Sequence, residues 1–302
     1  MILNAGNILL IGSILLFVSI VVGKAGFRFG VPALLLFLGV GMLFGTDGLG
    51  IEFNNPQTAQ FIGVIALSII LFSGGMDTSA AEIKPVLGQG IVLATVGVML
   101  TALLTGYFIY YITNLGNSFI TLNFTESLLL ASVMSSTDSA SVFSILRSKR
   151  QGLKENLRPM LELESGSNDP MAYMLTILLI GIIQSGESSL SNTILQFIMQ
   201  MSIGAVSGYL LGRLAVYCIN KLNINQSLYP VLLLAFVFFI FSFTDLVKGN
   251  GYLAVYLAGL VVGNHKVVHK KSLTTFFDGI TWLFQIVMFL TLGLLVNPAR
   301  SE

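Results

Sequence analysis

The sequence predicts an all-α polytopic membrane protein with about ten transmembrane helices, and three observations support this fold class. Of the 302 residues, 55% are hydrophobic and only 10% are charged, whereas a soluble domain carries about 25% charged residues. The mean hydropathy is +0.87. The apolar residues form ten long segments, and the basic residues lie mostly in alternate connections between them. A soluble globular protein is excluded.

Each segment approaches the roughly 20 apolar residues that cross about 30 Å of hydrocarbon. The connections contain turn-forming residues, such as GTDGLG at 45–50, NLGNS at 114–118, SGESSLSN at 185–192 and KLNINQS at 221–227. The first segment is expected to be a retained span, because no basic residue precedes Lys24 and a cleavable signal peptide begins with a basic region. In chain order the segments are 6–23, 29–45, 58–75, 85–112, 125–146, 158–184, 192–220, 227–246, 250–264 and 273–296.

The basic residues predict the orientation, because short cytoplasmic loops of membrane proteins are enriched in Lys and Arg. Only Lys248 and Arg300 lie in one set of alternate connections, and Arg213 lies within the seventh segment. We therefore expect the amino terminus outside and the other set in the cytoplasm. That set holds Lys24, Arg28, Lys84, Arg147, Lys149, Arg150, Lys154, Arg158, Lys221, Lys266, Lys270 and Lys271.

Two pairs of segments resemble each other at one spacing. Aligning the second segment with the ninth places Gly41 against Gly259, and aligning the third with the tenth places Gly75 against Gly293, both 218 positions apart. The members of each pair cross the membrane in opposite directions, so an inverted repeat is predicted. Chance similarity between Leu- and Gly-rich helices is the alternative, and the shared spacing disfavours it.

The repeat predicts three parts of the chain. Residues 1–184 are expected to form a first six-helix repeat, 185–226 a linker helix, and 227–302 a partial second repeat. The counterpart of the segment that begins near Pro85 would begin near position 303, just beyond Glu302. We therefore expect that the chain is truncated at its carboxyl end.

Three acids lie well inside predicted spans, namely Asp138, Glu164 and Asp169. A charged side chain at the bilayer centre costs at least ~2.5 to 3.5 kcal/mol, so such residues are functional candidates by default. Asp138 belongs to a hydroxyl-rich stretch, 135–141, that favours a locally broken helix. Pro170 removes a helical hydrogen bond directly after Asp169.

The residue types around these acids favour an alkali cation. Ser165 and Asp169 are one helical turn apart and offer hard oxygen ligands, which suit K⁺ or Na⁺ better than a soft transition metal. The alternative is that the polar residues only join helices through hydrogen bonds. Serine and threonine would suffice for that purpose, so two aspartates near the membrane midplane favour a transport site.

Other function classes have little support. A nearly neutral charge balance, 15 Lys and Arg against 14 Asp and Glu, does not suggest nucleic-acid binding. Cys218 is the only cysteine, so no disulfide, redox or zinc motif is present, and we expect no cofactor. An enzyme such as an intramembrane hydrolase is disfavoured, because the sequence has no GxSxG motif. A cation channel and a transport-inactive fragment or sensor subunit stay open as alternatives.

Two motifs resemble those of a known family. The sequences TDSASV at 137–142 and ESGSNDPMAY at 164–173 resemble the paired core motifs of the monovalent cation:proton antiporter family. The second motif and GNGYLAVYLAGLVVGN at 249–264 resemble the NhaP-type, CvrA-like potassium/proton antiporters of bacteria. The resemblance covers essentially the whole chain, and the two motifs together are specific.

This resemblance implies a sodium/proton-antiporter-like fold in a multi-pass protein of the bacterial inner membrane. It implies exchange of K⁺ or Na⁺ for protons in pH homeostasis, by a homodimer whose first three spans lie on the dimerisation side and the next three in a mobile core. Asn168 in place of a second aspartate resembles the electroneutral branch. The implied ion and proton site consists of Asp169, with Thr137 and Asp138 at an unwound crossing, and Glu164, Ser165 and Asn168.

Overall fold

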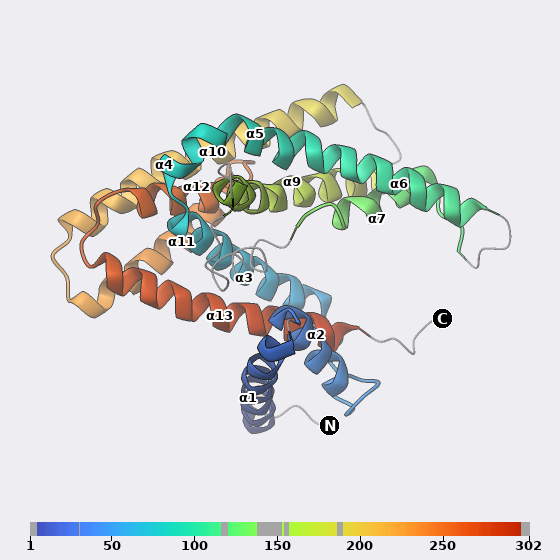
Figure 1. Ribbon diagram of the computed structural model, residues 1–302, viewed down its shortest axis with the longest axis horizontal. Coiled ribbons are helices and arrows are strands. Elements are labelled where there is room, and N and C mark those ends of the chain that lie inside the picture. The colour runs from blue at the N-terminus through green and yellow to red at the C-terminus, as the bar shows by residue number, and fades with distance from the viewer. Residues whose placement is uncertain are drawn as a thin grey trace. The chain divides into compact units, whose positions relative to one another are not determined.

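The computed structural model describes residues 5–29, 31–115, 120–137, 153, 157–185 and 190–296, and these residues form helices and no strands (Figure 1). Each of the ten predicted segments contains a helix among the described residues, so the predicted all-α fold class is confirmed. The principal helices are α1 (Ala5–Phe29), α2 (Ala33–Phe44), α3 (Pro56–Asp77), α6 (Val98–Asn114), α7 (Phe124–Val133), α9 (Leu157–Ser185), α10 (Leu190–Lys221), α11 (Tyr229–Leu246), α12 (Gly251–Asn264) and α13 (Lys270–Leu295).

The fourth predicted segment is one long helical stretch, Ala80–Asn114, with two irregular turns before α6. It begins with α4 (Ala80–Ile83), passes through a 3₁₀ turn at Lys84–Val86 that contains Pro85, and continues as α5 (Leu87–Val92). A π-helical turn at Leu93–Gly97 then leads into α6. Proline is tolerated in such a tight turn near the start of a helix, where its missing N–H costs little.

Six helical stretches among the described residues are long and apolar enough to cross a membrane. The other four predicted segments contain shorter apolar helical stretches of 10–17 residues, although α1 as a whole is 25 residues long. Most of α12 is buried by neighbouring helices, which provides the protein surroundings that a short segment needs at membrane depth. The shorter stretches are Leu9–Lys24 within α1, Ala33–Phe44, Phe124–Val133 and Gly251–Asn264.

The chain divides into two compact units, residues 1–70 with 275–302, and residues 71–274. In the first unit α2 crosses α13 at very short range. A Cβ atom on Gly41 would lie 2.5 Å from the Leu290 carbonyl oxygen, and Gly293 faces the Leu38 carbonyl in the same way. Only glycine permits this approach of two backbones.

The second unit contains the equivalent crossing, between α12 and α3. Here Gly259 faces the Phe72 carbonyl oxygen and Gly75 faces the Tyr256 carbonyl oxygen. All four residues are 218 positions from their counterparts in the α2–α13 crossing. The sequence repeat is therefore also a repeat of contacts, and the predicted inverted repeat is confirmed. The two compact units are defined by contacts and do not have the bounds of the predicted repeats. The predicted repeat boundaries therefore stay a prediction.

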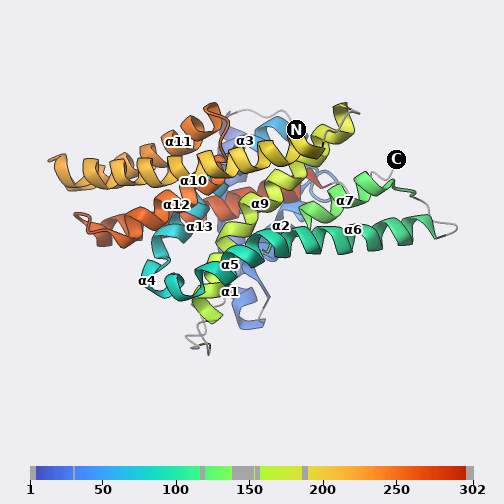
Figure 2. The ribbon, with the colours of Figure 1, turned by 90° about the horizontal axis from the view of Figure 1, so that it is seen from above.

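Within the second unit, α12 lies alongside α10 over its whole length (Figures 1 and 2). Three glycines spaced four residues apart on α10 face α12. Cβ atoms on Gly204, Gly208 and Gly212 would lie 2.7, 2.5 and 2.9 Å from atoms of Asn250, Ala254 and Ala258, respectively. Small residues at this spacing let the helices pack closely, which fixes the position of α12.

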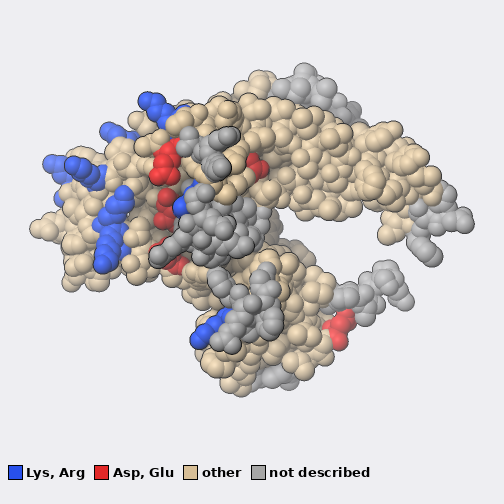
Figure 3. Space-filling view, viewed as in Figure 1, with Lys and Arg blue, Asp and Glu red and all other residues tan. Residues whose placement is uncertain are grey.

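Basic connections of the second unit meet at one end of that unit, where Figure 3 shows blue side chains concentrated. The Asn220 side chain donates to the Lys266 carbonyl at 2.8 Å, and the Ala80 amide donates to Asn264 at 2.7 Å. These bonds join the connection after α10 and the start of α4 to the connection between α12 and α13. The charge count assigned the connections that contain Lys84, Lys221 and Lys266 to the cytoplasmic side, and these three connections thus lie together.

Candidate functional site

Helix α7 ends before the polar residues of the fifth predicted segment. A capping box begins it: the Asn123 side chain accepts from the Glu126 amide at 2.9 Å, and Glu126 accepts from the Asn123 amide at 2.8 Å. At the other end, the hydroxyls of Ser132 and Ser135 donate to carbonyls three residues earlier. The expected helix over 125–146 is therefore wrong at 134–137. Residues 138–146 lie outside the described residues, so the local break that the hydroxyl residues favoured stays a prediction.

Helix α9 brings the second motif opposite residues 134–137. Ser165 and Asn168 are fully buried, and Glu164 and Asp169 are half-buried. The helix continues through Pro170. Since proline has no N–H group, the Gly166 carbonyl lacks its usual helical partner beside Asp169.

Asn168 connects the two motifs. Its side-chain amide donates to Thr137 Oγ1 at 2.6 Å and to Glu164 Oε1 at 3.0 Å, and its Oδ1 accepts from the Ser136 hydroxyl at 3.1 Å. Thr137 in turn donates to Ser165 Oγ at 3.2 Å. Both amide hydrogens of Asn168 are used, so the buried amide is satisfied.

The segment that follows α7 brings a hydroxyl group to Asp169. Ser136 Oγ is hydrogen-bonded to Asp169 Oδ1, and the same oxygen lies within reach of Asn168. Ser136, and the hydrogen-bonded pair Thr137 and Ser165 on the other side of Asn168, offer neutral oxygens, the ligands that alkali cations favour. Among the residues that the structure describes, no three His, Cys, Asp or Glu side chains come together.

Of the predicted site residues, Thr137, Glu164, Ser165, Asn168 and Asp169 are brought together, and Asp138 lies outside the described residues. Sequence reasoning missed Ser136 as a partner of Asp169, although it belonged to the hydroxyl-rich stretch.

Two residues of the α12 region were also missed. The Tyr256 ring packs on Gly166, where a Cβ would lie 2.7 Å from Cε2. Asn250 donates to the Pro170 carbonyl at 3.3 Å and accepts from the Leu253 amide at 2.9 Å. Its capping role was detectable as an asparagine directly before an apolar segment. Nothing in the sequence pattern indicated its contact with Pro170 or that of Tyr256 with Gly166.

Two curated antiporters are similar to this chain over nearly its whole length. The K(+)/H(+) antiporter NhaP of Alkalimonas amylolytica is 43% identical over 295 residues, which are 97% of this chain and 50% of that protein. The K(+)/H(+) antiporter NhaP2 of Shewanella oneidensis is 38% identical over 299 residues, which are 98% of this chain and 50% of that protein. The chain thus spans about half the length of these relatives.

The fold also matches a solved structure. The sodium proton antiporter MjNhaP1 from Methanocaldococcus jannaschii, at pH 8, superposes with a TM-score of 0.77 at 21% identity, over 95% of this chain and 70% of that chain. A model of the family described as sodium/hydrogen exchanger, transmembrane, matches residues 12–301. Because that match covers nearly the whole chain, the protein belongs to the sodium/hydrogen exchanger family.

Proposed function

We propose that this protein takes part in exchange of a monovalent cation, K⁺ or Na⁺, for protons across the bacterial cytoplasmic membrane. Two observations support this proposal: the chain belongs to a transporter family, and its sequence is 43% and 38% identical to those of two K(+)/H(+) antiporters. The activity is transport rather than chemical catalysis. The proposal includes a homodimer, an amino terminus outside, and the three-part division at residues 184 and 226.

The observation that carries the proposal is the position of Ser136 between Asp169 and Asn168. A serine hydroxyl has one hydrogen to donate. When Asp169 is ionised, that hydrogen serves the carboxylate; when Asp169 is protonated, its own O–H can donate to Ser136, which can then donate to Asn168. The hydrogen-bond network therefore accommodates both protonation states without moving a helix.

Competition at Asp169 then couples the two fluxes. A bound proton and a bound alkali cation each neutralise the carboxylate, and the bare charge is the costly form at membrane depth. Thr137, Ser165 and Asp138 are proposed to supply further oxygen ligands, and Asn168 to hold Thr137 and Glu164 in place. A neutral asparagine at 168 leaves one exchanging charge, which fits exchange of one cation for one proton.

The test begins with binding, since cation binding to the folded state raises its stability. Purified protein in detergent is expected to unfold at a higher temperature in KCl or NaCl than in choline chloride at pH 8, and acidification should reduce this increase. Asp169→Asn should abolish the cation-dependent increase. Asp245→Asn, at an exposed acid on α11, should retain it as the matched control.

Transport is then measured in proteoliposomes with a pH-sensitive dye inside. In the full-length protein, an imposed K⁺ or Na⁺ gradient should drive saturable proton movement in the wild type and in Asp245→Asn, but not in Asp169→Asn. Retention of cation stabilisation and exchange by Asp169→Asn would refute the assignment. Large cation currents without coupled proton movement would instead identify a channel.

A further inference from the structure

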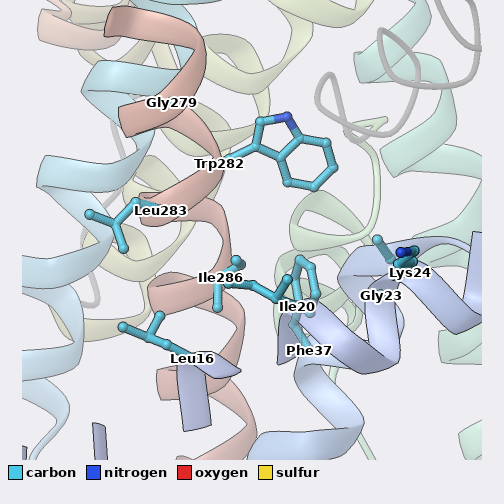
Figure 4. Close-up of a pocket in the computed structure, with 10 residues that line it drawn as sticks. Leu16, Ile20, Gly23, Lys24, Phe37, Gly279, Trp282, Leu283 and Ile286 are labelled. Atoms are coloured by element: carbon cyan, nitrogen blue, oxygen red, sulfur yellow. The ribbon is translucent and has the colours of Figure 1, made fainter. Parts of the chain in front are cut away.

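The first compact unit contains a cavity of about 770 Å³ between α1, α2 and α13 (Figure 4). The buried Phe37 ring forms part of its wall, and Ile20, Trp282 and Ile286 face the same space. This volume lies within the range of pockets that hold small molecules, ~300 to 1,000 Å³.

The cavity has a charge at one end. Leu16, Ile20 and Lys24 all line it and follow one another at four-residue intervals, so they share one face of α1. Eight residues of helix correspond to a rise of about 12 Å. Among the described residues that line the cavity, Lys24 alone is charged, and it lies toward the end of α1 that the charge count assigns to the cytoplasm.

Two glycines make this space. Gly23 allows the Phe37 ring to approach α1, since a Cβ there would lie 3.1 Å from the ring. Gly279 on α13 also lines the cavity, but a Cβ there would have no neighbour within 4 Å. The helix packing therefore accommodates a Cβ atom at Gly279 without a clash, and a side chain built from it borders the cavity.

We propose that this cavity binds an anionic phospholipid, with an acyl chain along the apolar wall and the phosphate at the Lys24 ammonium group. An acyl chain gains little by leaving the bilayer for an apolar pocket, because lipid is as apolar as leucine. Selectivity therefore depends on the headgroup, and basic pockets between membrane helices on the cytoplasmic side bind anionic headgroups. The exposed Lys24 ammonium group complements a phosphate in charge, which favours a lipid rather than a second copy of the chain as the occupant.

Native mass spectrometry of the purified, delipidated protein tests the proposal. Phosphatidylglycerol and phosphatidylcholine with identical acyl chains are titrated separately. We expect phosphatidylglycerol to bind more tightly. Lys24→Gln should weaken its binding about five-fold, the change that corresponds to ~1 kcal/mol for one basic residue near a membrane surface. The matched control Lys271→Gln, at an exposed lysine, should bind as the wild type does.

Filling the cavity provides the second arm. Gly279→Phe should abolish the preference for phosphatidylglycerol. Gly12→Phe should preserve this preference. A Cβ atom at Gly12, on α1, likewise has no neighbour within 4 Å, but Gly12 does not line the cavity. Circular dichroism verifies the helix content of each variant.

Equal binding of both lipids to the wild type would overturn the proposal, as would full phosphatidylglycerol binding by Gly279→Phe. If Gly279→Phe and Lys24→Gln shift the monomer–dimer equilibrium and leave lipid binding unchanged, a second copy occupies this face and the proposal is wrong. These measurements require no transport, so they are independent of the proposed exchange.

Discussion

Asn250 offers a substitution series that separates two of its contacts. This residue is 4% exposed and lies between α9, α10 and α12. Its side-chain oxygen caps α12 at the Leu253 amide, at 2.9 Å, and its side-chain nitrogen donates to the Pro170 carbonyl, at 3.3 Å. Asn250→Ser retains a good capping oxygen but loses the donor to Pro170, whereas Asn250→Ala loses both.

The structure sets the expected magnitudes. Loss of a helix cap costs typically ~1 kcal/mol. Hydrogen bonds between membrane helices average ~0.6 kcal/mol and reach about 1.7, and the 3.3 Å contact with Pro170 is long, which places it toward the lower value. We therefore expect about 0.6 kcal/mol of destabilisation for Asn250→Ser and about 1.6 for Asn250→Ala. Serine and alanine are similar in size, so the difference between the two variants reports the cap.

Thermal unfolding in detergent, followed by circular dichroism, measures this order. Asn250→Asp adds a control, since aspartate caps as well as asparagine but buries a charge beside the Pro170 carbonyl; it should be less stable than the serine variant. If the serine variant is as unstable as the alanine variant, the capping assignment is wrong. If the serine variant is as stable as the wild type, the bond to Pro170 contributes nothing.

Two further predictions concern the site and the repeat. Asn168→Asp places a carboxylate where the amide now donates to Glu164 at 3.0 Å. Two negative charges at that distance repel by about 5 to 6 kcal/mol at an effective dielectric of ~20. The loss of thermal stability should therefore be larger at pH 8 than at pH 5, and an equal loss at both would contradict this reasoning. Gly41→Ala and Gly259→Ala direct a Cβ into facing carbonyls and should each cost ~1 to 3 kcal/mol. Gly39→Ala has no neighbour within 4 Å and should instead gain the helix propensity of alanine; equal unfolding temperatures for these three variants would exclude the crossing geometry.

Much of the fold was predictable because the bilayer imposes simple rules on sequence. The ten segments and the grouping of basic connections follow from the cost of placing polar groups in hydrocarbon. The repeat was detectable because Gly41, Gly75, Gly259 and Gly293 occupy crossings that tolerate no larger side chain. The bounds of α12 were predictable to within one residue, 250–264 against Gly251–Asn264. Its burial was not, because an apolar segment buried in protein has the same composition as one that faces lipid.

The candidate site was predictable in composition but not in connectivity. Acids and hydroxyls inside apolar segments indicated Thr137, Asp138, Glu164, Ser165 and Asp169 as candidates, because such residues are costly there. Asn168 was added by the resemblance to the antiporter family. The pattern did not indicate that Ser136 rather than Thr137 contacts Asp169, since neighbouring hydroxyls in a broken helix are equivalent by composition.

The sequence by itself determined the membrane class, the order of the helices, the repeat and the residue types of the site, since each of these depends on hydropathy, charge and spacing along the chain. Only the tertiary structure decided which side chains meet: Ser136 with Asp169, Asn250 with Pro170, and Tyr256 with Gly166. The last two contacts join residues at least 80 positions apart. They depend on how closely α9, α10 and α12 cross, and that distance is set by glycine packing in three dimensions rather than by any local pattern.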